Sequence, residues 1–253
     1  MLRKWMPWIG VLVLALSVAA CAPTQATTTA AAPAAASPLA TTAPAEAPTE
    51  AAPATVPAVD ATAAAASGLT TEEVADLLHM REEEKLARDV YLTLYDKWGA
   101  QVFQNIAGAE QTHMDAVKTL LTTYGIADPV AQTQDQRGVF TDPKLQALYD
   151  QLVSKGSASL VDALTVGATI EDLDIKDLND AMARTDKTDI RSVYENLKMG
   201  SESHMRAFVS NLRAQGADYT PQYITEEEFQ QTLQGSSGRG QGQGNGQGPA
   251  SGG

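Results

Sequence analysis

The sequence predicts an all-α protein, namely a four-helix bundle with one long connection and short accessory helices. Apolar residues recur at three- and four-residue spacing through most of the segment 68–234, which is the period of an amphipathic helix. One motif also occurs twice: Glu110-Gln-Thr-His113-Met-Asp-Ala116 and Ser201-Glu-Ser-His204-Met-Arg-Ala207. In both copies a glycine, Gly125 or Gly216, follows the histidine twelve residues later. The repeat predicts one helical unit used twice, each copy closed by a left-handed glycine.

The first two predicted helices form a hairpin. Thr70-Thr-Glu-Glu73 has the spacing of a capping box and predicts a helix start, and Trp98-Gly99 predicts its end. A second helix is expected from about 102 to 124 on the basis of its apolar spacing. Because only a few residues separate the two helices, we expect them to pack antiparallel.

A long connection and a second hairpin follow. The stretch 126–156 contains two Asp-Pro pairs and Gly138, and a short helical pattern begins at Leu145. Two long helices are predicted at about 159–184 and 189–215, and a short capped turn begins at Thr225. The order of hairpin, long connection and hairpin is that of a four-helix bundle with one crossover.

The two ends of the chain predict segments outside this domain. Arg3 and Lys4 precede a short apolar stretch, and Val18-Ala-Ala-Cys21 resembles the lipobox before a lipidated cysteine. We therefore expect a lipoprotein signal peptide at 1–20, a lipid-anchored linker rich in Ala, Pro and Thr at 21–67, the helical domain at 68–234, and a disordered Gly/Gln/Ser tail at 235–253. The expected location is the bacterial cell envelope, with lipid as the membrane anchor and the domain facing outside the cytoplasm. An ordinary signal peptide or uncleaved anchor with an incidental cysteine is the alternative.

The cysteine count and the net charge exclude several kinds of site and partner for the domain. Cys21 is the only cysteine, so disulfides, thiolate metal sites and cysteine nucleophiles within the domain are excluded. The formal net charge of −13 repels phosphate backbones, so we expect no nucleic-acid partner and regard metal cations as plausible partners.

Acidic and histidine residues lie where the predicted helices face the bundle interior. Glu-x-x-His presents an oxygen and a nitrogen ligand on one helix face, because residues three apart are neighbours there. The predicted metal ligands come from all four long helices: Glu84, Glu110, His113, Glu171, Asp174 and His204. Burying several carboxylates without a cation is costly, so their convergence predicts a metal site.

The order of these motifs resembles a known group of proteins. Glu84-x-x-Ala87-Arg88-x-x-Tyr91, Glu110-x-x-His113, Glu171-x-x-Asp174 and His204-x-x-x-Phe208 are similar to the rubrerythrin branch of the ferritin-like superfamily. The runs Gly167–Ile175 and Asn196–His204 are closer to an uncharacterised ferritin-like family, domain of unknown function 2202. The resemblance implies a ferritin-like four-helix bundle and a centre of one or two iron or manganese ions, with zinc as a further option.

One departure from the rubrerythrin pattern concerns the second metal position. Where that pattern has a second Glu-x-x-His, this chain has Ser201-x-x-His204. Either Asp174 supplies the missing carboxylate, or the site holds one ion well and the other poorly.

Three functions remain open at this point. The first is an oxidoreductase centre that acts on dioxygen or peroxide, which would need a redox partner or a self-sufficient dismutation because the chain has no Cys-x-x-Cys module. The second is a protein that binds divalent metal without turnover, and the third is a helical interaction module whose site has decayed. A homodimer is compatible with each.

Four other residues near the predicted site are not expected to bind metal. His79 has no partner pattern and is expected to be exposed. Tyr91 is expected to be an ordinary core tyrosine, and a hydrogen bond to a ligand or a role in electron transfer is the alternative. Gly167 and Gly200 each lie one turn before a predicted ligand, and a mid-helix glycine costs about 1 kcal/mol relative to alanine. Close helix packing at the site or tolerated drift would each explain these two glycines.

Overall fold

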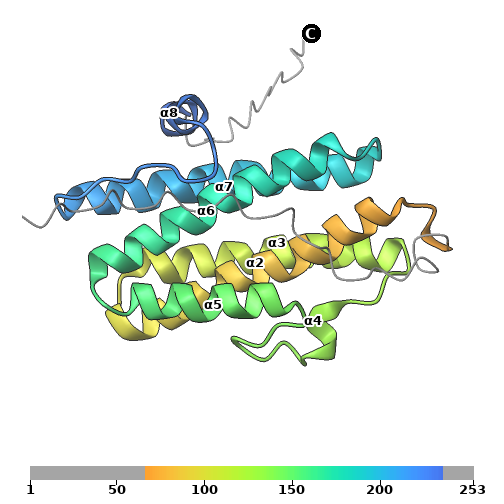
Figure 1. Ribbon diagram of the computed structural model, residues 1–253, viewed down its shortest axis with the longest axis horizontal. Helices are drawn as coiled ribbons and strands as arrows, with labels where there is room; N and C mark the ends of the chain where they lie inside the picture. The colour runs from red at the N-terminus through yellow and green to blue at the C-terminus, as the bar shows by residue number, and fades with distance from the viewer. Residues whose placement is uncertain (1–65, 236–253) are drawn as a thin grey trace, which may run out of the picture. The chain divides into compact units, whose positions relative to one another are not determined.

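The computed structural model describes residues 66–235, and every regular element in this range is a helix. The helices are labelled as in Figure 1: α2 (Thr71–Trp98), α3 (Gln101–Thr123), α4 (Pro129–Gln132), α5 (Pro143–Gly156), α6 (Leu160–Ala183), α7 (Thr188–Ala214) and α8 (Glu226–Gln234). The predicted signal peptide, Cys21, nearly all of the linker and the tail beyond Gly235 lie outside the described residues.

The helix ends follow the signals in the sequence. Thr70 caps α2 through its side chain, which accepts from the backbone N–H of Glu73 at 3.1 Å, and the Glu73 carboxylate accepts from the N–H of Thr70 at 2.8 Å. The capping box is therefore present as predicted. Gly125 after α3 and Gly216 after α7 have φ of 66° and 77°, the left-handed values expected at the ends of the repeated motif.

Two helical hairpins make the bundle. Helices α2 and α3 pack along each other, as do α6 and α7, and the hairpins meet where α2 contacts α6 and α3 contacts α7. The connection between them contains α4, which packs on α2, and α5, which packs on α2 and α6 (Figure 1). Helix α8 lies on α7. The prediction of an all-α bundle with one long connection is confirmed.

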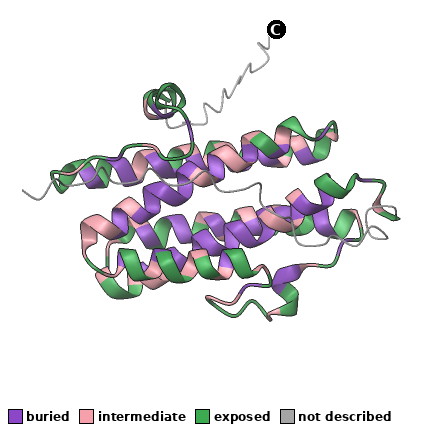
Figure 2. Cartoon of the chain, viewed as in Figure 1, coloured by how far each residue is buried: buried purple, intermediate pink, exposed green. Residues whose placement is uncertain are grey.

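The apolar core is divided into two clusters along the bundle. One contains Val90, Phe103 and Phe208, and the other contains Leu77, Val117 and Leu197. Between them, α2 buries five consecutive charged residues, 81–85, and the other three long helices bury acidic residues or histidine. Figure 2 shows that buried positions run along each of the long helices. A buried polar layer therefore separates two hydrophobic cores.

Helix α2 is buried on nearly all sides because the connection covers it. Arg81 forms an ion pair with Asp128 at 3.0 Å, and Lys85 donates to the carbonyl oxygen of Gln136 at 2.8 Å. Glu82 accepts from the backbone N–H of Thr141 at 2.6 Å. These contacts fix the long connection to the bundle. Among the described residues, no helix has the length and apolarity needed to cross a membrane.

Candidate metal centre

The buried polar layer brings five of the predicted ligands together. Glu84 comes from α2, Glu110 and His113 from α3, Glu171 from α6 and His204 from α7. The three carboxylate residues are each 2% exposed. Each helix carries its ligands between the two apolar clusters, so the packing of those clusters sets the positions of the ligands.

Glu110 lies at the middle of the cluster, and its two oxygens face different histidines. Its Oε2 is 2.7 Å from Nδ1 of His113, and its Oε1 is 2.8 Å from Nδ1 of His204. The two imidazole rings are stacked with centroids 5.6 Å apart. The histidines of the repeated motif therefore meet across the interface between α3 and α7, with one carboxylate between them.

The other two carboxylates complete two groups of three ligands. Glu84 Oε2 is 3.2 Å from Nδ1 of His113, and Glu171 Oε2 is 3.5 Å from Nδ1 of His204. Glu84, Glu110 and His113 form one group, and Glu110, Glu171 and His204 form the other, with ligand atoms in each group within 4.8 Å of one another. Glu110 belongs to both groups. This arrangement fits a pair of cations that share one carboxylate.

Two buried polar atoms at this site have neither a hydrogen-bond partner nor an ion-pair partner among the described residues. They are Glu84 Oε1 and Asp174 Oδ1. A buried polar atom that lacks a partner costs about 1–3 kcal/mol, and more when it is charged. Since both atoms belong to carboxylates of the buried layer, the residues fit a bound cation better than a closed hydrogen-bond network.

The electrostatics of the cluster agree with a site for positive charge. Burial raises the pKa of Glu84 to about 8, and the neighbouring Glu110 adds to this shift. Burial opposes the charged forms of Glu110 and the two histidines, but their mutual attraction outweighs it. The pKa of Glu110 falls to about 2, and those of His113 and His204 rise to about 11 and about 10. The two imidazoles are therefore protonated, because the surrounding carboxylates favour positive charge at this place.

Tyr91 lies in the apolar core as expected and also contacts the centre directly, which is the alternative that the sequence left open. Its hydroxyl donates to Glu171 Oε1 at 2.5 Å, while Glu171 Oε2 faces His204. Burial raises the pKa of Tyr91 well above its usual value, with Glu171 as the next cause. Tyr91 therefore stays protonated and fixes the orientation of the Glu171 carboxylate.

Asp174, the sixth predicted ligand, lies beside the centre rather than in either group of three. Its Oδ2 accepts a short hydrogen bond from the hydroxyl of Ser201, and its Oδ1 has no partner among the described residues. Burial raises the pKa of Asp174 well above its usual value, and Glu84 is the second cause. Asp174 on α6 thus brings a carboxylate next to Ser201, which stands where the first copy of the repeated motif has Glu110.

The two mid-helix glycines have packing reasons. A Cβ on Gly200 would overlap the imidazole of His113, and a Cβ on Gly167 would overlap the ring of Phe208. Gly200 on α7 therefore leaves the space that the His113 ring of α3 occupies. Of the two explanations left open by the sequence, close helix packing is the one that the structure supports.

His79 is half-buried rather than fully exposed, and it has partners that were not predicted. Its side chain is 37% exposed, and its Nε2 lies near carboxylate oxygens of Glu83 and Asp177. A signal for this contact was present, because His79 and Glu83 are four residues apart on one helix face. Asp177 could not be paired with them before the contact between α2 and α6 was known.

Comparisons with known proteins identify relatives of the domain. The family model of an uncharacterized protein domain, DUF2202, matches residues 73–236. The uncharacterized protein MJ0754 of Methanocaldococcus jannaschii is 59% identical over 172 residues, which cover 68% of this chain and 92% of the relative. The crystal structure of this hypothetical protein matches with a TM-score of 0.66 and 58% identity, over 67% of this chain and 96% of that chain. This chain belongs to the DUF2202 family.

Proposed function

We propose that the domain binds two divalent first-row metal ions, iron or manganese, within the bundle. One ion would be held by Glu84, Glu110 and His113, and the other by Glu110, Glu171 and His204. The observation that carries this proposal is the division of the Glu110 oxygens between two histidines, at 2.7 and 2.8 Å. Carboxylates with a few imidazoles suit iron and manganese, and zinc is a further option because it accepts the same ligand types.

Asp174 is the additional carboxylate in this proposal. Its support is the contact with Ser201 and the unpartnered Oδ1, which together put an acceptor oxygen beside the centre. Of the two alternatives that the sequence left open, compensation by Asp174 is favoured. The ligand set then amounts to four carboxylates and two imidazoles, which is similar to the dinuclear centres of the ferritin-like superfamily. We propose that the DUF2202 family is a branch of that superfamily.

We infer that this centre is an oxidoreductase site for peroxide or dioxygen. Iron or manganese supplies one-electron redox changes and open coordination positions. The protein excludes bulk water, orients Glu171 through Tyr91 and holds its carboxylates in an apolar surrounding. Dismutation converts two molecules of hydrogen peroxide into two of water and one of dioxygen. It needs no external electrons and suits a domain without a Cys-x-x-Cys module, whereas reduction alone would require a redox partner.

Metal binding without turnover is the second candidate. The observation that favours it is the low exposure of the two histidines, 13% for the side chain of His113 and 11% for that of His204, which restricts access by a substrate. A small molecule such as hydrogen peroxide passes a restriction that excludes larger substrates, so a peroxide assay separates the two candidates.

The test is metal analysis followed by a peroxide assay on the full chain purified without chelators. The proposal expects close to two iron or manganese ions per chain and release of dioxygen from added peroxide by the loaded protein. Metal at this stoichiometry without dioxygen release would support the second candidate. If neither ion binds or raises the melting temperature, the metal-centre proposal fails.

We also propose that the domain is held at the cell envelope by a lipid on Cys21. This proposal rests on the lipobox-like Val18-Ala-Ala-Cys21 and on the short apolar stretch before it. Changing Cys21 to Ser is expected to stop lipid modification and to move the protein from the membrane fraction to the soluble fraction. Unchanged processing and membrane retention of the Ser variant would contradict it.

A further inference from the structure

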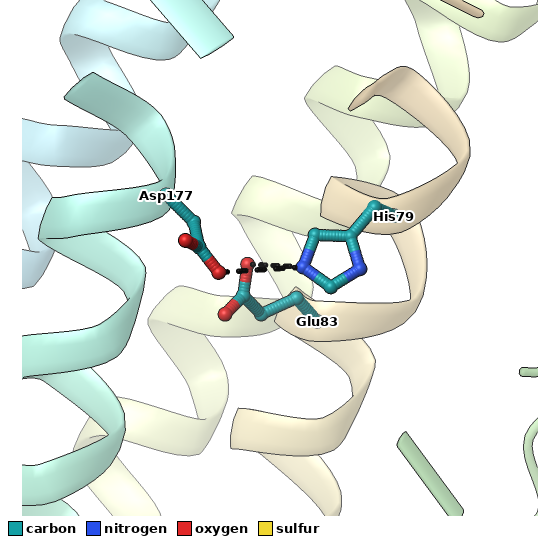
Figure 3. Close-up of side chains that lie close together, drawn as sticks. All are labelled: His79, Glu83 and Asp177. Carbon is teal, nitrogen blue, oxygen red and sulfur yellow. Dashed lines mark ion pairs between the residues drawn. The ribbon is translucent and has the colours of Figure 1, made fainter. Parts of the chain in front are cut away.

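We propose that His79, Glu83 and Asp177 form an additional divalent-cation site, separate from the dinuclear centre. The three side chains share no residue with the centre. His79 and Glu83 project from one face of α2, and Asp177 approaches them from α6 (Figure 3). The site offers one imidazole nitrogen and two carboxylate oxygens, a ligand set that zinc, manganese and ferrous iron accept.

The distances within this cluster fit a shared ion better than direct hydrogen bonds. Nε2 of His79 is 3.4 Å from Glu83 Oε2 and 3.5 Å from Asp177 Oδ2. Hydrogen bonds from N–H to oxygen usually span about 2.7–3.2 Å. Ligand atoms that lie about 2.0–2.2 Å from a tetrahedral zinc ion are about 3.3–3.6 Å apart, which matches the observed spacing.

Glu83 supplies an independent observation in favour of a ligand. Its side chain is 3% exposed, and its Oε2 points at Nε2 of His79 but has no hydrogen-bond partner among the described residues. The imidazole of His79 faces this carboxylate only across 3.4 Å, whereas a zinc ion between them would lie about 2.0–2.2 Å from each ligand atom. A bound metal ion would therefore fit at the point where the three side chains meet.

The surroundings of the cluster allow an ion to enter. The side chains of His79 and Asp177 are 37% and 24% exposed, so one side of the cluster reaches solvent while Glu83 forms its buried end. Lys176 binds the other oxygen of Asp177, Oδ1, at 3.2 Å and leaves Oδ2 facing His79. The cluster is therefore accessible where the dinuclear centre is closed.

The test uses the fact that the chain has only three histidines, two in the centre and one in this cluster. Zinc is titrated into the metal-free full chain while the imidazole nitrogen resonances of all three are followed by NMR. We expect the His79 resonance to move to a zinc-bound position. Asp177→Asn and Glu83→Gln should each weaken this response at least ~10-fold, since each removes a ligand.

Asp180→Asn is the matched control. Asp180 lies on the same helix one turn later and pairs with Lys176 at 2.7 Å, outside the cluster, so its variant should bind zinc at His79 as the original does. Unchanged zinc responses of His113 and His204 would establish that the Asp177 and Glu83 variants are folded.

The outcomes separate this site from the dinuclear centre. A His79 resonance that ignores zinc while His113 and His204 respond would overturn the additional site alone. The reverse pattern would overturn the dinuclear centre alone. Zinc binding at His79 that is equally strong in Asp177→Asn and Glu83→Gln would reduce the site to a single imidazole and would also overturn the proposal.

Discussion

Asp172 and Glu110 are both buried carboxylates on core helices, and their surroundings differ completely. Asp172 on α6 accepts from the hydroxyl of Tyr219 at 2.7 Å and from three backbone N–H groups of residues 222–224. Glu110 on α3 instead faces two ionisable side chains, with Oε2 at 2.7 Å from Nδ1 of His113 and Oε1 at 2.8 Å from Nδ1 of His204.

The difference separates a structural carboxylate from a candidate ligand. The donors around Asp172 belong to the segment after α7, so its charge is compensated by the fold itself and ties that segment to the bundle. The neighbours of Glu110 are other ionisable groups that are themselves metal-ligand types. Burial alone therefore does not mark a functional acid, whereas burial against other side chains that can bind a metal indicates one.

The largest expected loss of metal affinity comes from Glu110→Gln. This change keeps the size of the side chain but removes the negative charge that both groups of ligands share, so both ions should bind at least ~100-fold more weakly. Manganese at one hundred times its dissociation constant should stabilise the original protein by about 2.7 kcal/mol for each ion bound. Denaturant unfolding with and without manganese measures this gain, which Glu110→Gln should lose.

Asp172→Asn is the matched control for that experiment. The amide nitrogen of Asn cannot accept the hydrogen bonds that Asp172 receives, so the free energy of unfolding should fall by about 2–4 kcal/mol, with or without metal. Metal affinity should stay within a few-fold of the original. If Asp172→Asn lost the metal and Glu110→Gln kept it, the distinction between the two carboxylates would be wrong.

Metal binding is expected to release protons from the histidines. The carboxylates raise the pKa of His113 to about 11 and that of His204 to about 10, so both imidazoles carry two protons at pH 7 without metal. A ligating imidazole must be neutral, so the affinity should rise with pH by up to about tenfold per unit for each proton released. Calorimetry in buffers of different ionisation enthalpy counts these protons.

The same raised pKa values predict how the metal-free protein responds to pH. The stabilisation from His113 and His204 should be complete below their ordinary pKa of 6.5 and should be lost as the pH rises through about 10 to 11.

His113→Gln should release one proton fewer on metal binding. Equal proton release by the original and this variant would contradict the assignment of His113.

Gly200→Ala tests whether the position of the His113 ring matters. The added Cβ would overlap the imidazole of His113, so the ring must shift and the affinity of the Glu84–His113 position should fall about 10–100-fold. Gly108→Ala on α3 is the control, because no atom lies within 4 Å of its added Cβ. That variant should gain up to about 1 kcal/mol of stability and bind metal normally. Equal metal affinity in the two variants would remove the role assigned to Gly200.

The helices, and the residues that meet at the candidate centre, could be predicted from the sequence for a clear reason. Capping boxes, left-handed glycines and the repeated histidine motif are local patterns, and they set the ends of α2, α3 and α7. Facing helices of a bundle then bring residues at the same level together. Glu110 and His204 could therefore be assigned to one site without knowing any side-chain position.

The remaining parts of the site depend on packing between distant segments. Glu82, Glu83 and Glu84 are consecutive acids that point in directions about 100° apart on α2. Glu82 binds the connection at Thr141, Glu83 faces His79, and Glu84 faces His113. Glu84 was predicted as a ligand from its motif, but the partners of Glu82 and Glu83 could not be predicted, because they come from elements that only the fold brings close.

The smallest expected change in metal affinity is that of Ser201→Ala. Comparing it with Asp174→Asn distinguishes Asp174 as a metal ligand from Asp174 as a hydrogen-bond partner of Ser201. Ser201→Ala removes the hydroxyl that donates to Asp174, and the affinity for metal should change by less than about tenfold because no proposed ligand is lost. Asp174→Asn should lower the affinity about 10–100-fold if Asp174 contributes the additional carboxylate. Metal titrations of the two variants, analysed for both ions, give the comparison. If Asp174→Asn weakens binding no more than Ser201→Ala does, Asp174 serves only to hold Ser201, and the centre has three carboxylates rather than four.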